Sequence, residues 1–485
     1  MQETLLNSPT SAGRTGPIVA VLAAAGIVAS LTQTLVVPLI AQLPAMLHTT
    51  AADASWVITV TLLTGAVSTP VAGRLGDLYG KRPMLLVSMI PLVAGSAIAA
   101  MASGLVVMVI GRGIQGLAMG MIPLGISLIR DVLPPQKVGT AIALMSSSMG
   151  IGGALGLPIA AAVAQDLDWR WLFWGTAAAA AVEFVLIWRL IPAPPVSEAA
   201  TTRRFDFLGA VGLAAGLVAL LLAVSKGSEW GWAGGSTIAC FVAAVVILVA
   251  WGMWEFRSPA PLVDLRVTIS RPVLLTNTAS IVVGFGMYAQ SLIIPQIMQL
   301  PVATGYGLGQ TMLQMGLWMI PQGVAMMAVS PLGAKVSARY TPKVTLTIGC
   351  LIMAAGYAGA TVLMGSTWGL VIATAVSGAG VGFAYGAMPA LIMANVPLSE
   401  TGSANSVNSL MRSIGTSVSA AVIGAVLTGM SVQLGGHAIP TENGFIAALL
   451  IGCGAALAAA GIAATIRSTG AKSAERPERE LETAA

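Results

Sequence analysis

Long apolar segments recur along the whole chain of 485 residues and are separated by short polar loops. A helix needs roughly 20 predominantly apolar residues to span a membrane, and fourteen segments reach that length. Because lipid cannot satisfy an exposed backbone, such segments must be helices packed into a bundle. The fourteen predicted spans are centred near Ile27, Leu62, Leu92, Leu117, Gly152, Ala181, Gly216, Val245, Val283, Trp318, Met353, Gly380, Ser417 and Gly452.

The distribution of Lys and Arg predicts how these spans are oriented. With fourteen spans, nineteen of the 23 cationic residues lie on the side that carries both termini, and only Arg170 and Lys226 lie on the other side. Short loops rich in Lys and Arg stay in the cytoplasm, so we expect both termini to be cytoplasmic. Omitting one helix would invert every later loop and remove this bias. The two remaining cations, Arg112 and Arg412, fall within predicted helices.

Composition agrees with an all-α membrane protein. Hydrophobic residues make up 56% of the chain and charged residues 8%, whereas a soluble protein carries about 25% charged residues. The net charge of +5 comes from short loops beside the lipid bilayer, so it does not indicate a nucleic-acid partner. The three cysteines lie in separate apolar segments without metal-ligand spacing. With no phosphate-binding loop or nucleophile–base pair in the sequence, we expect no metal, no cofactor and no enzymatic activity.

The loop between the second and third predicted spans concentrates charge. It reads Gly73-Arg74-Leu75-Gly76-Asp77-Leu78-Tyr79-Gly80-Lys81-Arg82, which places four charges in ten residues. Its glycines permit a tight turn and a close approach of backbones. Charge at this density in so apolar a chain indicates a functional loop.

Two stretches of the chain recur at nearly the same offset, as expected of a transporter built from two related bundles. The offset is 261 residues for the first stretch, in which Pro70, Arg74, Tyr79 and Arg82 match Pro331, Lys335, Tyr340 and Lys343. It is 263 residues for the second, in which Gly139, Ala141, Ser146, Ile151 and Gly152 match Gly402, Ala404, Ser409, Ile414 and Gly415. An offset near 262 leaves room for six helices and two inserted ones, at about Phe207–Val224 and Thr237–Trp254.

Several motifs together resemble the drug:proton antiporter branch of the major facilitator superfamily with fourteen helices. They are the loop 73–82, Arg112-Gly113-Ile114-Gln115-Gly116, Trp169-Arg170-Trp171-Leu172-Phe173 and the stretch from Gly402 to Arg412. The resemblance covers nearly the whole chain and implies two six-helix bundles with an inserted pair. The implied organisation is a cytoplasmic tail at 1–16, a bundle at 17–191, a linker at 192–205, the inserted helices at 206–257, a linker at 258–271, a second bundle at 272–466 and a cytoplasmic tail at 467–485.

The sequence departs from the pattern of this branch at two places. The first-helix stretch reads Leu31-Thr32-Gln33-Thr34, with Thr32 where exporters of the branch usually carry an aspartate. In the fifth helix the antiporter motif retains Gly152 and Gly156, but Pro158 is displaced by one residue. The first departure leaves the proton-binding residue unassigned, and the second weakens the assignment to the antiporters.

Embedded charges are the main candidates for function, because a charge at the bilayer centre costs about 2.5–3.5 kcal/mol. Arg112, with Gln115 one turn along the helix, either lines the substrate pathway or is a structural arginine bound to backbone carbonyls; we favour the pathway. Arg412 lies on a polar stripe with Asn405 and Asn408. This stripe fits both a cavity wall and a seam of interhelical hydrogen bonds.

Two acidic residues are assigned different roles. Glu183 is the only acidic residue deep within a predicted span, and it is either a proton carrier or a neutral, hydrogen-bonded structural group. For Asp77 the resemblance implies a contact with a helix N-terminus of the other bundle, which holds the cytoplasmic side shut. Ala338 occupies the matching position of the second half, so such a gate would be one-sided. The alternative for Asp77 is a simple topology anchor.

Polar side chains on the ninth and tenth predicted helices complete the candidate pathway. They are Tyr288, Gln290, Gln314 and Trp318, together with Gln33 of the first helix. Amides and aromatics among 24 methionines suit a plastic, apolar binding site.

The resulting hypothesis is a secondary transporter of the bacterial cytoplasmic membrane that exports amphipathic small molecules, such as drugs or antibiotics, in exchange for protons. An uncoupled or differently coupled carrier of a lipid-like, anionic or neutral metabolite is the alternative, motivated by Thr32 and the two embedded arginines. A membrane receptor or scaffold without transport is a third possibility. Analogy with the family implies a monomer.

Overall fold

The structure is a computed structural model that describes residues 15–39, 43–193, 205–434 and 437–466. Among these residues, fourteen helices are long and apolar enough to span a membrane. This confirms the predicted all-α membrane protein with fourteen spans. Residues 1–14 of the first predicted tail, the whole of the second at 467–485, most of the first predicted linker and residues 435–436 lie outside the described residues, whereas Thr15 and Gly16, predicted as tail, already belong to the first helix.

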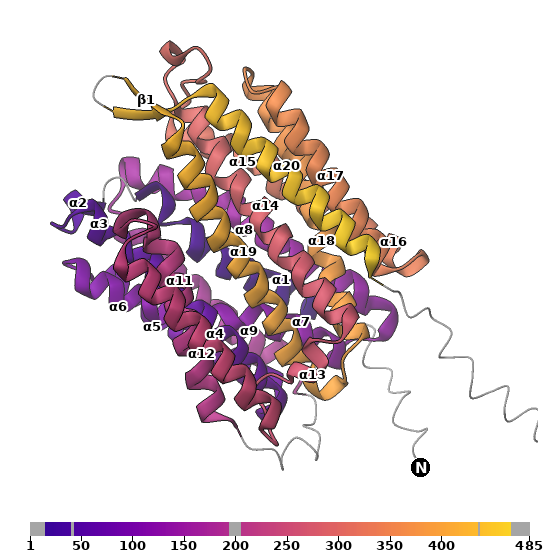
Figure 1. Cartoon of the computed structure of the whole chain (residues 1–485). Coiled ribbons are helices and arrows are strands. Elements are labelled where there is room, and N and C mark those ends of the chain that lie inside the picture. The colour runs from indigo at the N-terminus through magenta and orange to yellow at the C-terminus, as the bar shows by residue number, and fades with distance from the viewer. Residues whose placement is uncertain (1–14, 40–42, 194–204, 435–436, 467–485) are drawn as a thin grey trace, which may run out of the picture.

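The first six spans form the N-terminal bundle, drawn in indigo to magenta (Figure 1). Its helices are α1 (Thr15–Thr34), α4 (Trp56–Tyr79), α5 (Lys81–Ala100), α6 (Leu105–Gly116) continued by α7 (Met121–Val132), α8 (Pro135–Asp166) and α9 (Arg170–Leu190). The fourth span was predicted as one helix, but a 3₁₀ turn at Leu117–Gly120 divides it. Two short helices, α2 (Leu43–Met46) and α3 (Ala51–Ala54), lie between α1 and α4.

The inserted pair is α11 (Phe207–Trp230) and α12 (Gly235–Arg257). Both helices are longer than predicted, and Lys226 lies in the last turns of α11 rather than in a loop. Leu213, Leu217 and Leu221 of α11 pack in one apolar cluster with Leu63 of α4 and Leu410 of α19. The insert therefore covers a seam between the two bundles.

The last six spans form the C-terminal bundle, drawn in red to yellow (Figure 1). Its helices are α14 (Arg271–Gln299), α15 (Met312–Ala328) continued by α16 (Ser330–Arg339), α17 (Pro342–Val362), α18 (Thr367–Ala394), α19 (Thr401–Gly429) and α20 (Glu442–Thr465). A short helix α13 (Leu265–Thr268) precedes it, and an unpredicted antiparallel hairpin of β1 (Ser431–Leu434) and β2 (His437–Pro440) joins α19 to α20.

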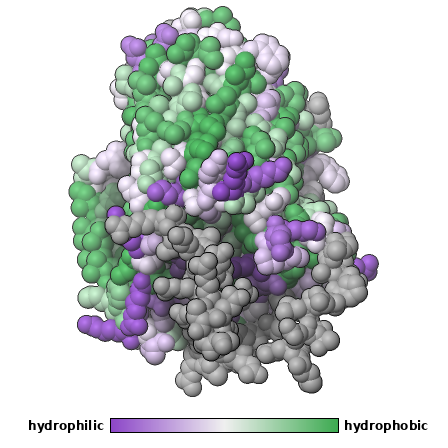
Figure 2. Space-filling model, turned by 90° about the vertical axis from the view of Figure 1, so that its right-hand side faces the viewer, coloured by the Kyte–Doolittle hydropathy of each residue, from purple (hydrophilic) through white to green (hydrophobic). Residues whose placement is uncertain are grey.

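Local sequence sets where several of these helices begin. Proline occupies the first turn of α8, α14, α16 and α17, where its missing N–H costs no helical hydrogen bond. Asp206 caps α11 by accepting a hydrogen bond from the Gly209 amide at 2.7 Å. Thr311 and Gln314 form a reciprocal capping box at the start of α15. Apolar residues dominate much of the visible surface of the spans (Figure 2), as expected of a surface that faces lipid.

The two bundles meet along two seams that small residues keep close. A Cβ atom on Gly316 of α15 would lie 2.8 Å from the Pro158 nitrogen of α8. In the other seam, a Cβ atom on Gly73 of α4 would lie 2.6 Å from the Gly402 carbonyl of α19. Small residues let helix backbones approach in this way where lipid provides no hydrophobic driving force.

Glycines also set the packing inside the C-terminal bundle, which leads to a stability prediction. A Cβ atom on Gly349 of α17 would lie 2.6 Å from the Gly380 carbonyl and 2.9 Å from the Ala384 amide nitrogen of α18. Because both obstacles are backbone atoms, we expect Gly349→Val to lower the free energy of unfolding by about 1–3 kcal/mol. Gly461→Val in α20 is the matched control, since no atom lies within 4 Å of the position of its Cβ. Equal thermal unfolding midpoints for the two variants in detergent would contradict this packing.

Candidate functional site

The charged loop predicted from the sequence is a single-residue turn between two helices. Helix α4 ends at Tyr79, and α5 begins at Lys81. Gly80 between them has a φ of 99°, a conformation that residues with a Cβ atom rarely adopt. This turn lies at the terminal end of the molecule, by which we mean the end where α1 begins and α20 ends. The Lys and Arg distribution predicts that the terminal end faces the cytoplasm.

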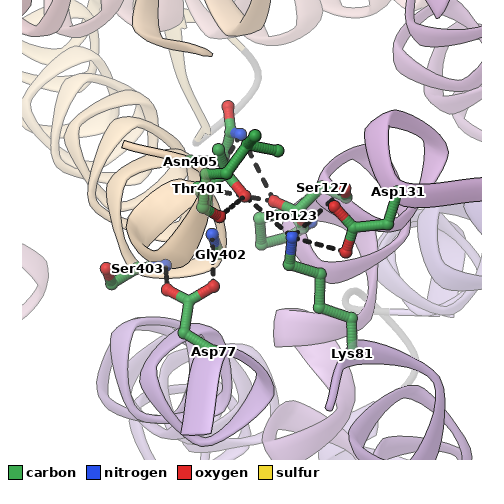
Figure 3. A network of polar contacts seen from close by, with 10 residues as sticks. Asp77, Lys81, Pro123, Ser127, Asp131, Thr401, Gly402, Ser403 and Asn405 are labelled. Carbon is green, nitrogen blue, oxygen red and sulfur yellow. Dashed lines mark hydrogen bonds and ion pairs between the residues drawn. The ribbon is translucent and has the colours of Figure 1, made fainter. Parts of the chain in front are cut away.

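Asp77, in the last turn of α4, binds the first turn of α19 in the other bundle (Figure 3). Its two carboxylate oxygens accept hydrogen bonds from the backbone amides of Gly402 at 2.9 Å and Ser403 at 2.7 Å. The carboxylate thereby satisfies two amides that have no partner within their own helix, at the positive end of the helix dipole. Only 8% of Asp77 is exposed, so little water competes for these bonds.

Lys81 makes a second bridge between the bundles (Figure 3). Its ammonium group lies 2.7 Å from an Asp131 carboxylate oxygen of α7 and donates a hydrogen bond to the Thr401 hydroxyl of α19 at 2.8 Å. Ser127 of α7 donates to the Thr401 carbonyl at 3.0 Å, and Asn405 donates to the Ser127 hydroxyl at 3.3 Å. We call Asp77, Lys81, Ser127, Asp131, Thr401 and Asn405, with the amides of Gly402 and Ser403, the cross-bundle network.

The other charged residues of the loop lie beside this network. Arg74 is buried in α4, with 4% of its surface exposed. Arg82 instead holds its own bundle together, because it donates a hydrogen bond to the Trp188 carbonyl of α9 at 2.5 Å. A further bond between the bundles comes from Arg130, which donates to the Met393 carbonyl of α18 at 2.7 Å. Asp131, Ser127, Thr401 and Arg130 had not been selected from the sequence.

Arg112 lies in α6 with 1% of its surface exposed. It donates hydrogen bonds to the backbone carbonyls of Val57 at 3.2 Å and Thr32 at 3.0 Å, and to the Gln115 side-chain oxygen at 2.7 Å. Gln115 in turn donates to the Ser96 hydroxyl at 2.7 Å. These bonds match the structural alternative for Arg112, an arginine bound to backbone carbonyls. They tie four helices of the N-terminal bundle together, α1, α4, α5 and α6.

Arg412 of α19 has a different set of neighbours. It donates hydrogen bonds to the Asn408 amide oxygen at 2.8 Å and to the Ser409 hydroxyl at 3.3 Å, and its guanidinium lies 5.0 Å from the centre of the Tyr385 ring. Asn408 donates to Asn277 at 2.9 Å and to Ser280 at 2.7 Å, both on α14. The polar stripe thus divides: Asn405 meets the N-terminal bundle, while Asn408 and Arg412 contact helices of their own bundle.

Glu183 of α9 is buried in the N-terminal bundle with 3% of its surface exposed. Ala180 and Ile187, one turn before and after it, belong to the apolar core. One of its carboxyl oxygens, Oε1, has no hydrogen-bond partner. Glu255 of α12, which the sequence prediction had left outside the span, is a second buried acid, with 2% exposed and the same oxygen unpartnered.

The remaining predicted pathway residues do not form one cluster. Gln314 is exposed at the start of α15 and is used in its capping box, and Trp318 donates to the Gln310 side chain at 3.0 Å. Gln33 donates to the Met119 sulfur at 3.2 Å. Gln290 is buried in α14 with its side-chain oxygen unpartnered, and Tyr288 is half-buried on the same helix.

The glycines of the antiporter motif in α8 face α1, whereas Pro158 of the same motif faces α15. A Cβ atom on Gly152 would lie 2.5 Å from the Ile27 carbonyl of α1, and one on Gly156 would lie 2.9 Å from the Thr34 Cβ. Pro158 instead contacts Gly316 across the seam to α15. Within the described part of the chain, no group of three His, Cys, Asp or Glu side chains could hold a metal ion.

Comparison with known proteins gives one family over most of the chain. The model of the Major Facilitator Superfamily matches residues 22–420. The chain is 25% identical over 384 residues to the multidrug transporter protein MdtP of Bacillus subtilis, covering 78% of this chain and 69% of that one. It is 28% identical over 400 residues to the "Probable actinorhodin transporter" of Streptomyces coelicolor, covering 77% and 66%. The human organic anion transporter MFSD10 has a similar fold, with a TM-score of 0.66 at 14% identity over 94% of this chain and 100% of that one.

The cross-bundle network predicts that removing the charge of Asp77 loosens the terminal end. A carboxylate at a helix N-terminus contributes about 1 kcal/mol, which corresponds to roughly a fivefold shift between two conformations. Ser406, fully buried under Gly73, can be replaced by Cys as a reporter after the three native cysteines are changed to Ala. We expect Asp77→Asn to raise the rate of alkylation at position 406 by about that factor.

Asp168→Asn is the matched control, because Asp168 is an exposed acid at the opposite end that pairs with Arg170. It should leave the alkylation rate unchanged. A rate at position 406 that is the same in the Asp77→Asn variant and in the parent protein would show that the carboxylate does not hold the bundles together.

Proposed function

The chain belongs to the major facilitator superfamily, a family of transporters and not of enzymes, and we propose that it exports amphipathic small molecules in exchange for protons by alternating access. The relatives named for multidrug and actinorhodin transport support drugs or antibiotics as the substrates, and a relative named a tetracenomycin C resistance and export protein supports export as the direction. We further propose that it is a monomer in the bacterial cytoplasmic membrane, with both termini in the cytoplasm.

The cross-bundle network is the observation that carries this proposal. Among the described residues, the network joins the two bundles at the terminal end of the spans that it connects and not at their opposite end. Each of its bonds is polar and can be replaced by a bond to water. If the terminal end is cytoplasmic, this conformation is the one closed to the cytoplasm. A contact of about 0.3–2 kcal/mol biases two conformations without locking either, which alternating access requires. The topology-anchor alternative for Asp77 does not account for its bonds to α19.

Proton coupling is assigned to Glu183. The Thr32 hydroxyl, at the place of the usual first-helix acid, donates a hydrogen bond to the Ala29 carbonyl at 2.6 Å, and a threonine does not titrate. A carboxyl group can bind and release a proton, and placing its charged form in an apolar core costs free energy. Proton binding at Glu183 would therefore change the relative stability of the conformations between which α9 and its neighbours move.

An uncoupled or differently coupled carrier is the second candidate. It is favoured by Arg112 and Arg412, because neither forms an ion pair within the described residues. Arg112 is bound to backbone carbonyls, so Arg412 is the cation that would attract an anion without any need for a proton. The two candidates differ in whether transport follows the proton gradient.

Transport in proteoliposomes tests the proposal. We expect an imposed pH gradient to drive movement of a fluorescent amphipathic dye by the wild-type protein. Glu183→Gln should abolish the gradient-driven component while dye binding persists, because the amide keeps the shape of the side chain but carries no titratable proton. Glu442→Gln, in the first turn of α20, is the control and should transport normally.

Two other results would change the assignment. Transport that ignores both the gradient and the Glu183→Gln substitution would contradict proton exchange and support the uncoupled carrier. Gradient-driven transport that survives Glu183→Gln would retain antiport but remove Glu183 as its proton site. Absence of any gradient-driven or downhill movement of the dye would leave the scaffold interpretation in place.

A further inference from the structure

The guanidinium of Arg412 is a buried charge without a buried countercharge. It is 7% exposed, and its hydrogen bonds go to an amide oxygen and a hydroxyl, both neutral. No carboxylate pairs with it among the described residues. A buried charge is usually paired, and removing one partner of such a pair is costly because the other charge is left uncompensated. Arg412 therefore retains a capacity to bind an anion.

Arg112 of the same protein is an arginine whose guanidinium is held by fixed acceptors. Its hydrogen bonds go to two backbone carbonyls of other helices as well as to Gln115, and backbone acceptors cannot rotate away. Arg412 contacts the Tyr385 ring of α18, and its hydrogen bonds go to side chains of its own helix, Asn408 and Ser409. Ser409 can change rotamer and release one guanidinium N–H group to another acceptor, whereas Asn408 is held by its own bonds to Asn277 and Ser280.

The surroundings of Arg412 suit the remainder of an amphipathic molecule. Its charged group lies against the Tyr385 ring of α18, and the Tyr385 hydroxyl donates to the Met287 sulfur at 3.0 Å. Ser280 donates to the Met388 sulfur at 2.9 Å. Methionine side chains are flexible and polarizable, so they adapt to apolar ligands of different shape. The site therefore combines one cation, one aromatic ring, amides and thioethers.

The site also lies directly behind the cross-bundle network on the same helix. Arg412 follows Thr401, the first residue of α19, by eleven positions, or roughly 16 Å along the helix axis. Asn405, which contacts Ser127 of the network, is one turn from Asn408. Opening of the terminal end would therefore give a molecule from that side access to Asn408 and Arg412 in turn.

We propose that Arg412 binds the anionic group of the transported molecule, with Tyr385 against its apolar part, and that the substrates are amphipathic organic anions. That the bound molecule is a transported substrate rests on the proposed function, whereas the binding site itself does not depend on export. A carboxylate, sulfonate or phenolate would replace Ser409 as an acceptor while Asn408 keeps its bond, because a guanidinium offers five N–H donors. The charge-assisted bond would then select anions over neutral analogues of the same shape.

Binding of matched fluorescent probes to the purified full-length protein tests the proposal. Pyrenebutyrate carries a carboxylate, and pyrenebutyramide has nearly the same shape without the charge. We expect the wild-type protein to bind the carboxylate about tenfold more tightly than the amide, which is the effect of one charge-assisted hydrogen bond. Arg412→Gln should remove this preference and leave amide binding within about twofold. Arg412→Lys should keep part of the preference, because it keeps the charge but not the fork geometry.

Arg170→Gln is the control, since Arg170 is an exposed cation at the opposite end, and it should keep the wild-type preference. Equal losses for both probes in Arg412→Gln would show a purely structural role and overturn the proposal. An unchanged preference in that variant would overturn it too, as would a wild-type protein that binds both probes equally.

Transport of these two probes and of a third, ethidium, separates this inference from the proposed function. If the wild-type protein exports ethidium, a cation, but shows no preference for pyrenebutyrate, the anion site is overturned while export stands. If the protein binds pyrenebutyrate through Arg412 but moves none of the three probes, the anion site stands and export is overturned.

Discussion

The contact between the Asp77 carboxylate and the free amides at the start of α19 joins the two halves of this protein. Three neighbouring features of the terminal end support it. Gly73 and Gly402 let α4 and α19 approach closely enough for the bonds to form. The turn at Gly80 places Lys81 one turn beyond Asp77, so that Lys81 reaches Asp131 and Thr401. The inserted helix α11 then covers this seam with leucines. The second seam, between α8 and α15, is held by glycines rather than by charges.

The embedded cations differ in the groups that compensate their charge, and such compensation is needed because burying a charge in a membrane costs free energy. Lys226 is satisfied by Ser55 at 2.6 Å and Glu229 at 2.8 Å, and its ammonium lies 4.8 Å from the centre of the Trp56 ring. Arg112 is satisfied by backbone carbonyls. Arg412 alone among these three has only neutral side chains of its own helix as hydrogen-bond acceptors. Where a carboxylate or backbone carbonyls compensate the charge, the cation stabilises the fold; where only neutral side chains do, as at Arg412, we propose that the cation binds a ligand.

The number of spans could be predicted because hydropathy and the placement of Lys and Arg along the chain are strong signals that need no tertiary contacts, and the inserted pair followed from the offset of the internal repeat. The contact of Asp77 with a helix of the other bundle came from motif resemblance. The partners Ser127, Asp131 and Thr401 were missed because neutral hydroxyls and an acid at a helix end are common in any loop, and only the fold brings them to Lys81. Gln314 had been assigned to the pathway because it is polar in an apolar segment, but an amide in the first turn can cap the helix instead. No pattern in the sequence predicted the 3₁₀ turn that divides the fourth span or the β-hairpin between α19 and α20.

Distances between spin labels across the two bundles test the central claim, which is that the bundles alternate between closure at one end and at the other. One pair at Lys137 and Arg339 spans the terminal end, and another at Leu167 and Val302 spans the opposite end; all four residues are exposed. The account predicts two populations for each pair, with longer distances at one end accompanied by shorter distances at the other, and proportions that shift with pH and with substrate. A single distribution at both ends, unchanged under all these conditions, would contradict it.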